Sequence, residues 1–218
     1  MLKKYQTSTI RTANRQQGIV AQLANQYDIG CLYHMTHISN LVSILESGLL
    51  SHNLAHSKYH LRDISDQDVN ARRIEIEPIY KRSMHDYVPT YFAAKNPMSY
   101  KRREISDDLV ILKINPALLL QAGTLFTDGN AASSYTHFYR EIEDLKQLNW
   151  DCLHCDYWPD YPDGRRIRCA EMLIPDRIEM SDITAIAVNR KKSLKKIEQI
   201  AMPFVPVSVQ KELFFRTH

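Results

Sequence analysis

Residues 29–50 read IGCLYHMTHISNLVSILESGLL, a strand pattern followed directly by a helix pattern. The first part, IGCLYHM, is short and apolar, which is typical of a buried strand. In the second part apolar side chains recur at helical spacing, and Gly48 supplies a stop signal near the end. These apolar positions are Ile38, Leu41, Val42, Leu45 and Leu49. The segment therefore predicts a strand leading into a helix, with polar residues at the junction.

Outward from this segment, strands and helices are predicted to alternate irregularly. Apolar and β-branched runs predict strands at 88–93, 109–114, 124–127, 169–174 and 183–188. Helices are predicted over 133–148 and 193–201, with short ones after Pro97 and Pro116. Residues 51–86 have no apolar period and are expected to form a functional loop or a mobile segment. Without regular βαβ spacing or a glycine-rich phosphate loop, the pattern favours a compact α+β fold.

Length and composition set the broad class of protein. The chain has 218 residues, of which 44% are hydrophobic and 24% charged, as in ordinary globular domains. We expect a polar, basic arm over residues 1–27, either loose or a short helix laid on the body, followed by one domain over 28–218. No apolar run is long enough to cross a bilayer, and no secretory signal is recognisable, so a cytoplasmic protein is expected. The net charge of +3 permits an anionic partner.

The cysteines offer a weak metal signal. Cys152 and Cys155 have CxxC spacing, whereas zinc sites usually carry two such pairs. A reducing compartment makes disulfides unexpected as well. We therefore expect ordinary thiols and no metal.

Three polar clusters are candidates for chemistry. His34, Thr36 and His37 end a strand and could hold a ligand, although spacing alone favours a polar helix cap with a packed imidazole. Glu171 is a lone carboxylate in an apolar strand: either it is functional, or it sits on an edge strand and points to water. In the charged run 63–73, an arginine such as Arg73 could reach a phosphate or a polar transition state, although such runs are usually solvated.

Basic and aromatic residues alternate in three patches, near residues 95–103, 157–168 and 190–196. Positive charge combined with stacking platforms is what a groove for single-stranded nucleic acid needs. Each patch alone is more often an ordinary solvated face, and three together favour a nucleic-acid partner.

Taken in order, these motifs resemble the DarT family of DNA ADP-ribosyltransferase toxins. The similarity begins at 33–41 (YHMTHISNL) and continues through 49–53 (LLSHN), 71–73 (ARR), 85–89 (HDYVP) and 96–98 (NPM). It goes on through 126–129 (FTDG), 138–139 (FY), 150–151 (WD), 157–158 (YW) and 170–171 (AE). Each motif is weak alone, but their combined order and spacing over roughly residues 30 to 180 is specific.

The resemblance implies the ADP-ribosyltransferase fold, a split β-sheet core with flanking helices that grips NAD. It implies transfer of ADP-ribose from NAD, without a metal, to a base of single-stranded DNA, with a macrodomain antitoxin, DarG, that removes the modification. Glu171 matches the family's catalytic glutamate and Arg73 its second key residue, which we expect to act electrostatically because arginine stays protonated. Residues expected to line the NAD cleft are His34, Thr36, Asn40 and Tyr91. Residues expected to contact DNA are Lys95, Asn130, Arg165 and Arg166.

Two departures from the family pattern concern the base. Asn130 stands where the family often has a histidine, and Lys95 stands where it often has an arginine. An amide side chain both donates and accepts hydrogen bonds, so thymine and guanine both remain open. Two further alternatives remain: an enzyme of the same fold acting on RNA or protein, and a DNA-binding module without catalysis.

Overall fold

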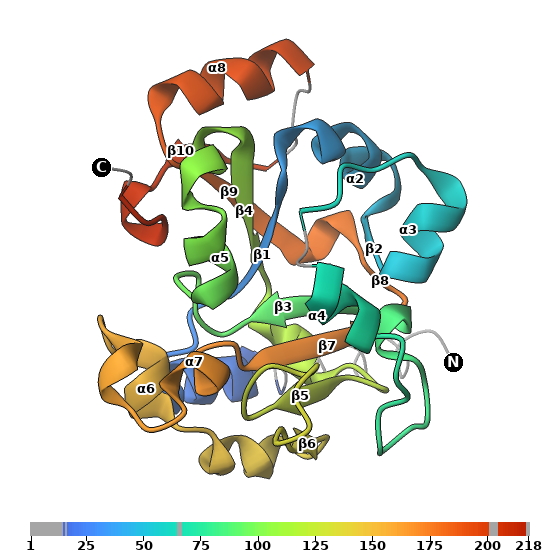
Figure 1. Cartoon of the computed structure of the whole chain (residues 1–218), viewed down its shortest axis with the longest axis vertical. Coiled ribbons are helices and arrows are strands. Elements are labelled where there is room, and N and C mark those ends of the chain that lie inside the picture. The colour runs from blue at the N-terminus through green and yellow to red at the C-terminus, as the bar shows by residue number, and fades with distance from the viewer. Residues whose placement is uncertain (1–14, 16, 65–66, 201–204, 217–218) are drawn as a thin grey trace, which may run out of the picture.

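The computed structural model describes residues 15, 17–64, 67–200 and 205–216. Within these residues, eight strands form one sheet in the order β10-β9-β4-β1-β3-β7-β5-β6, and β2 pairs with β8 in a small second sheet (Figure 1). The pairs in the large sheet are antiparallel except β9–β10. The strands are β1 Leu32–His37, β2 Leu49–Leu50, β3 Tyr87–Tyr91, β4 Leu109–Ile114, β5 Leu125–Thr127, β6 Phe138–Tyr139, β7 Glu171–Pro175, β8 Arg177–Ile178, β9 Ile183–Val188 and β10 Val207–Val209.

The large sheet is split at its centre. β1 pairs with β4 along its whole length, from Leu32 to His37, but with β3 only at Tyr33 opposite Tyr91. On the far side of the split, β3 pairs with β7 over five residues. Figure 1 shows the two halves diverging, with β1, β4 and β9 in one and β3, β7 and β5 in the other. This is the α+β split-sheet fold that the resemblance implies.

The core lies on both faces of the half that contains β4. Val110, Leu112 and Ile114 belong to the main apolar cluster, whereas Leu109 and Ile111 belong to a second one on the opposite face. Successive side chains of a strand point to opposite faces, so β4 must be apolar at nearly every position. This explains why the run LVILKI does not alternate between apolar and polar residues.

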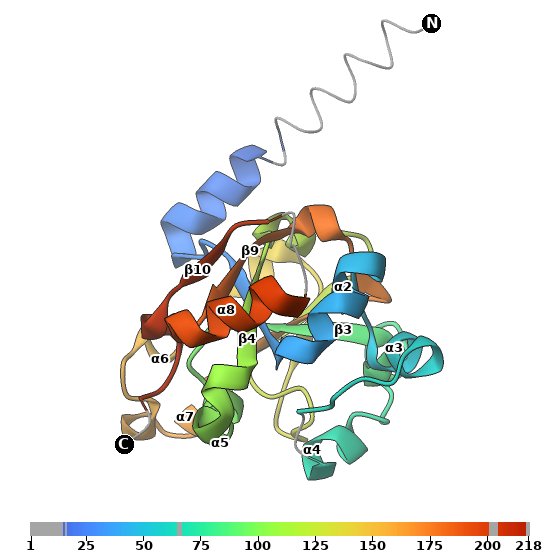
Figure 2. The same ribbon diagram turned by 90° about the horizontal axis from the view of Figure 1, so that it is seen from above.

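The helices are short and lie around the sheet (Figures 1 and 2). They are α2 Leu41–Ser47, α3 His52–Lys58, α4 Gln67–Arg72, α5 Pro97–Lys101, α6 Trp150–His154, α7 Gly164–Ile167 and α8 Lys191–Ile200. Single 3₁₀ turns are η1 Ile38–Asn40, η2 Met84–Asp86, η3 Arg103–Asp108, η4 Pro116–Leu120, η5 Ile142–Gln147, η6 Trp158–Asp160, η7 Met180–Asp182 and η8 Lys211–Leu213. None of the helices in the described part of the chain is both long and apolar enough to cross a membrane.

Gly48 ends α2 as predicted. Its φ of 75° lies in the left-handed region, and its N–H donates to Ile44 O at 2.8 Å. A Cβ at this position would lie 2.4 Å from Ile178 O on β8. Glycine is therefore required both by the backbone conformation and by the close approach of the small sheet.

Residues 17–27 are helical and lie against the body of the domain (Figure 2). Leu23 is 5% exposed and belongs to the main apolar cluster, and Tyr27 stacks on Trp150 at 4.9 Å between ring centroids. This is the helical form of the two considered for the arm. Residues 1–14 and 16 of the arm lie outside the described residues, and the boundary at residue 28 stays a prediction.

Two expectations from the sequence are wrong. The helix predicted over 133–148 is replaced by strand β6 and the turn η5. In this segment Phe138 pairs with β5 and only Leu145 is fully buried, so apolar residues at helical spacing reflect two separate contacts. The loop predicted over 51–86 contains α3, α4 and η2, helices that were missed because they bury few apolar side chains, Ala55 alone in α3.

Candidate active site

A cleft of about 530 Å³ opens on the face where the sheet is split. Residues of β1, α2, α3 and β3 line it, together with the segment around Arg73 and the residues that follow β5. Of the predicted site residues, those at the cleft surface are His34, Thr36, Asn40, Arg73, Tyr91, Asn130, Arg165 and Arg166. Residues more than a hundred positions apart in sequence thus meet in one cavity, whose size is ordinary for a ligand site.

Glu171 is the first residue of β7, an interior strand between β3 and β5. Its side chain is 1% exposed, so the alternative of an edge position facing water is wrong. It lies opposite Tyr91 of β3, which in turn lies opposite Tyr33 of β1. The Glu171 N–H donates to Thr127 Oγ1 at 3.1 Å. The carboxylate is therefore fixed on a strand at the split itself.

Arg73 holds the Glu171 carboxylate. Its Nη1 lies 3.1 Å from Oε1 and 2.9 Å from Oε2, and Arg73 is 8% exposed. Burial, the largest single effect, lowers the pKa of Arg73, but the charge of Glu171, the charge of Tyr91 and the hydrogen bond to Glu171 together raise it above its usual value. Arg73 lines the cleft, and the Glu171 carboxylate that it holds is buried directly beside it.

Arg73 also carries an unsatisfied nitrogen. Its Nη2 is buried and has no hydrogen-bond partner among the described residues. A buried donor without a partner is costly and commonly marks a place that a ligand fills. The guanidinium thus holds the carboxylate with Nη1, while Nη2 is a buried donor without a partner among the described residues.

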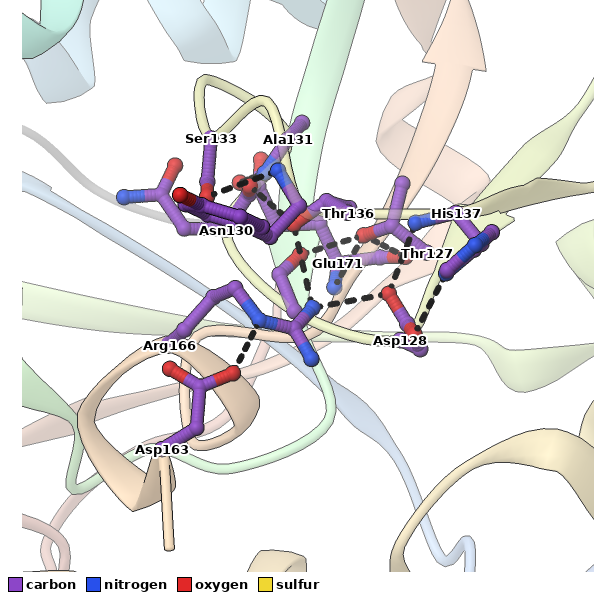
Figure 3. Close-up of polar contacts among 12 residues, drawn as sticks. Thr127, Asp128, Asn130, Ala131, Ser133, Thr136, His137, Asp163, Arg166 and Glu171 are labelled. Atoms are coloured by element: carbon purple, nitrogen blue, oxygen red, sulfur yellow. Dashed lines mark hydrogen bonds and ion pairs between the residues drawn. The ribbon is translucent and has the colours of Figure 1, made fainter.

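A backbone donor completes the setting of the carboxylate. Ala131 N–H donates to Glu171 Oε1 at 3.0 Å from the segment between β5 and β6 (Figure 3). Backbone amides give no sequence signal of this kind, so the residue-based analysis missed Ala131. Two donors from separate segments therefore fix the same carboxylate.

His34 is held as a neutral imidazole. Its Nδ1 donates to Pro89 O at 2.8 Å, which leaves Nε2 as the acceptor of the neutral ring. Burial lowers the pKa of His34, and the charge of Arg73 adds to this effect against the raising effect of the Pro89 bond. At neutral pH the ring therefore offers an acceptor nitrogen to a bound ligand.

Thr36 and Asn40 shape the wall rather than stand open to solvent. Asn40 Nδ2 donates to Thr36 Oγ1 and to Arg62 O, each at 3.0 Å, and Asn40 Oδ1 accepts from Arg62 N at 3.0 Å. The Thr36 hydroxyl still has its own proton to donate. His37 takes the simpler of its two interpretations, since its Nδ1 accepts from Ser39 N at 3.1 Å and caps η1.

Tyr91 borders the cleft beside the Arg73–Glu171 pair. Its hydroxyl donates to Met98 Sδ at 3.4 Å. Burial, followed by the negative charge of Glu171, raises the pKa of Tyr91 well above its usual value. The phenol therefore stays protonated at all physiological pH values.

The four predicted DNA contacts lie in different settings. Arg165 is exposed at the cleft, and Asn130 lines it while its Oδ1 accepts from Ala132 N at 3.0 Å. Lys95 is half-buried and does not line the cleft; its carbonyl accepts from Arg168 Nε at 2.7 Å. Arg166 lines the cleft, but its guanidinium is engaged with Asp128, Thr136 and Asp163.

Several cationic side chains in the three basic patches are buried or paired with carboxylates, so fewer of them are available to bind DNA than the sequence suggests. Arg168 is 7% exposed, and its Nη1 donates to the carbonyls of Cys152, Leu153 and Cys155. On α8 and its flank, Arg190 and Lys192 pair with Asp107, and Lys196 pairs with Asp108. Exposed aromatic rings remain at Tyr100, Tyr157 and Tyr135, the last of which is 81% exposed. Tyr135 lies outside the three basic patches, and no lysine or arginine is adjacent to it in the sequence, so it carried no sequence signal for nucleic-acid binding.

A stack of histidines lines the cleft on the side of α3. His52 lies 4.1 Å from His85 and 4.2 Å from His56 between ring centroids, and His85 Nε2 contacts Asn70 Oδ1 at 3.0 Å. Burial, and then the neighbouring His85 and His56, lower the pKa of His52 to about 4. In the sequence, the only indication of this stack is that segment 52–60 is rich in histidine and lacks the apolar periodicity of a core helix or strand.

Candidate metal ligands are few. In the described ranges, the one group of three side chains close enough to hold an ion is His52, His56 and Asp63. The CxxC pair is not part of it: Cys152 is fully buried, and burial raises the pKa of its thiol to about 11. The two sulfurs contact backbone carbonyls instead: Cys155 Sγ lies 3.1 Å from Cys152 O, and Cys152 Sγ lies 3.9 Å from Gly164 O.

Comparisons with known proteins agree with this geometry. Residues 33–215 match the family model described as "ssDNA thymidine ADP-ribosyltransferase, DarT". A DNA ADP-ribosyl transferase of Thermus sp. is 31% identical over 185 residues, which cover 79% of this chain and 88% of that protein. A DNA ADP-ribosyl transferase–DNA ADP-ribosyl glycohydrolase fusion protein of Thermosipho africanus is 32% identical over 80% of this chain and 47% of its own.

Solved structures give the same result in three dimensions. Thermus sp. DarT in complex with ADP-ribosylated single-stranded DNA superposes with a TM-score of 0.73 and 29% identity, covering 86% of this chain and 97% of that one. Thermosipho africanus DarTG in complex with ADP-ribose superposes with a TM-score of 0.76 and 30% identity. The superposition covers 85% of this chain and 51% of the DarTG chain. From the sequence match, the shared fold and the buried glutamate at the split, the chain belongs to the DarT family of DNA ADP-ribosyltransferases.

Proposed function

We propose that the protein is a toxin that transfers ADP-ribose from NAD to a base of single-stranded DNA. The observation that carries this proposal is the buried Arg73–Glu171 pair at a cleft of about 530 Å³, in a chain that matches the DarT family model over residues 33–215. NAD would lie along His34, Thr36, Asn40 and Tyr91. A Thermus sp. DarT structure contains NAD⁺, and its chain is 29% identical to this one.

Glu171 is assigned to the sugar side of the reaction. When the nicotinamide–ribose bond breaks, nicotinamide leaves with the bonding electron pair and positive charge develops at the anomeric carbon. A carboxylate fixed beforehand stabilises that charge without reorganising. The two donors that hold Glu171, Arg73 Nη1 and Ala131 N–H, supply this preorganisation.

Arg73 is assigned to the base side. The base nitrogen bonds to the anomeric carbon as nicotinamide leaves, and its proton passes to solvent water; negative charge develops on the base as the proton departs. The Arg73 pKa is raised, so the guanidinium acts as a permanent cation rather than as a general base. Its unpartnered Nη2 is the group available to meet that charge.

Single-stranded DNA would enter beside Asn130 and Arg165, with Arg166 and Lys95 nearby. A base must leave its stack before an atom of its pairing edge can react, and a single strand has already met most of that cost. We therefore expect modification of single strands in preference to duplex, with binding that weakens steeply as salt increases. Equal modification of the two forms would contradict this account of the DNA side.

Regulation by a macrodomain antitoxin of the DarG type is part of the proposal. The Thermosipho africanus relative is named as a fusion of transferase and glycohydrolase, and this chain spans 47% of its length. A glycohydrolase that removes ADP-ribose from DNA would limit the toxicity of the transferase. We also propose a cytoplasmic location, where NAD and DNA are both present.

The decisive experiment is mass spectrometry of short oligonucleotides after incubation with the protein and NAD. A set in which each member lacks one base identifies the modified base, and it separates thymine from guanine. A mass increase on DNA supports the proposal, whereas modification of RNA or of added protein alone would favour the second candidate target class. Binding of DNA without any modification or nicotinamide release would favour a non-catalytic module.

A further inference from the structure

The loop from residue 128 to residue 137 connects β5 to β6 and carries the amide that holds Glu171 (Figure 3). Its two ends are joined: His137 N–H donates to Asp128 Oδ1 at 2.9 Å, and Asp128 N–H donates to His137 O at 3.3 Å. Within the loop, Thr136 Oγ1 donates to Asn130 O at 2.7 Å. The loop is therefore a closed hydrogen-bonded unit, and its position depends on what anchors that unit to the body.

Arg166 on α7 supplies several of these anchoring contacts, beside those that Thr127 Oγ1 and Arg72 Nε make with the carbonyls of Gly129 and Ala132. Its Nη1 lies 2.9 Å from Asp128 Oδ1 and 3.1 Å from Thr136 Oγ1, and its Nε lies 2.5 Å from Asp163 Oδ2. Its carbonyl accepts from Asn130 N at 3.0 Å. One residue thus contacts the loop at Asp128 and Asn130 near its start and at Thr136 near its end, and Figure 3 shows its guanidinium between Asp128 and Asp163.

The surroundings of Arg166 suit a fixed side chain rather than a free cation. The side chain is 15% exposed, and that of Asp128 is 16% exposed. A Cβ on Gly129 would lie 2.3 Å from Arg166 Nη1. The absence of a side chain at Gly129 therefore lets the guanidinium lie directly over the loop backbone. The preceding residue, Arg165, is exposed to solvent and gives the contrast.

We propose that Arg166 is a positioning residue: by clamping the loop of residues 128–137, it sets the Ala131 amide and hence the Glu171 carboxylate for reaction. The assignment of catalysis to Glu171 rests on the proposed function. Arg166 therefore contributes to turnover through this loop, and its effect on DNA affinity is no greater than that of its neighbour Arg165. Asp128 and Gly129 form part of the same clamp with Arg166. Neither carries a positive charge, so neither is expected to attract DNA.

The test compares variants that differ in charge but share the loss of the clamp. Arg166→Ala removes a positive charge, Asp128→Asn removes a negative one, and Gly129→Ala changes no charge. We expect each to lower kcat for DNA modification at saturating oligonucleotide by about 10- to 100-fold, as small misplacements of reacting groups do. Nicotinamide release without DNA should fall in parallel, because both reactions need Glu171 in place. Arg166→Lys, which can keep one ion pair but not the fork, should recover part of the lost kcat.

Arg165→Ala is the matched control, because it removes the same charge from an exposed neighbour and measures the electrostatic effect on the KM for DNA. A rise in KM for Arg166→Ala with kcat unchanged would overturn the proposal, as would normal turnover by Asp128→Asn. If Arg166→Ala does not fold, as judged by its thermal melt, Asp128→Asn and Gly129→Ala decide the question. Wild-type protein that releases nicotinamide but labels no DNA would defeat the proposed function, while the nicotinamide readout would still rank these variants.

Discussion

Replacing Glu171 by alanine should abolish ADP-ribose transfer and NAD hydrolysis together. The substitution removes the two oxygens that Arg73 Nη1 contacts at 2.9 and 3.1 Å, and it leaves the Ala131 amide without its acceptor. Removing a preorganised electrostatic group of this kind costs about 10²–10³ in rate, or about 3–4 kcal/mol in the activation barrier. The rate loss exceeds this range if the ribose also loses its orientation.

The same substitution should also lower stability, because it leaves the Arg73 guanidinium buried without its counter-ion. Breaking a buried ion pair costs about 3–5 kcal/mol. Arg73 borders the cleft, where water can reach it, so we expect the lower end, about 3 kcal/mol. For a chain of 218 residues this corresponds to a fall in Tm of about 6–12 °C. In the double variant Arg73→Ala/Glu171→Ala, part of this loss should be recovered.

The assay measures nicotinamide release with and without DNA, alongside labelled oligonucleotide, at a temperature well below the Tm of the variant. NAD binding is followed separately, since the substitution leaves intact the contacts that we propose for NAD on the His34 side of the cleft. Near-normal DNA modification by Glu171→Ala would refute the assignment of the site. A thermal melt unchanged from the wild type would refute the argument that Arg73 depends on this carboxylate for its burial.

Three further results are expected. Arg73→Ala should lose most DNA modification yet retain slow NAD hydrolysis, since Glu171 keeps its Ala131 donor; equal loss of both activities would place Arg73 on the sugar side. A chelator should leave activity intact, and a loss restored by zinc would contradict metal-free chemistry. The folded-state pKa of His52, about 4, lies below the value of about 6.5 for an unfolded histidine, so between these values the unfolded chain binds the extra proton. Stability should therefore fall as pH drops from about 6.5 to about 4, and His52→Gln should flatten the dependence of Tm on pH; an unchanged slope would refute this role.

Much of the fold could be predicted because strands in the centre of a sheet have a strong local signal. β4, buried on both faces, and α2, closed by Gly48, follow directly from residue type and spacing. The edge of the sheet was less predictable. β6 has two residues, and its place is decided by pairing with β5, which the apolar spacing around Phe138 does not encode.

The site was predictable only in part, for a related reason. Glu171 stood out as a charge in an apolar strand, but its partner Arg73 is 98 positions away, and nothing in the local pattern joins them; the resemblance to a family supplied that link. Ala131 acts through its backbone and carries no side-chain signal at all. Arg166 and Arg165 look alike in sequence, yet one is clamped between carboxylates and the other is exposed, a difference that only the fold determines.

The single pairing between β1 and β3 has a consequence for how the enzyme opens. Backbone bonding along β1–β4 is continuous, but across Tyr33 and Tyr91 it is reduced to one register position. We therefore expect the two half-sheets to open as separate units in local unfolding. Both line the cleft, through β1 and β3, and Glu171 lies on the β3–β7 half. Amide hydrogens beside the split should exchange faster than those within β4, and NAD, by bridging the halves, should slow that exchange. The least extensively paired position in the large sheet therefore lies beside the proposed reaction site.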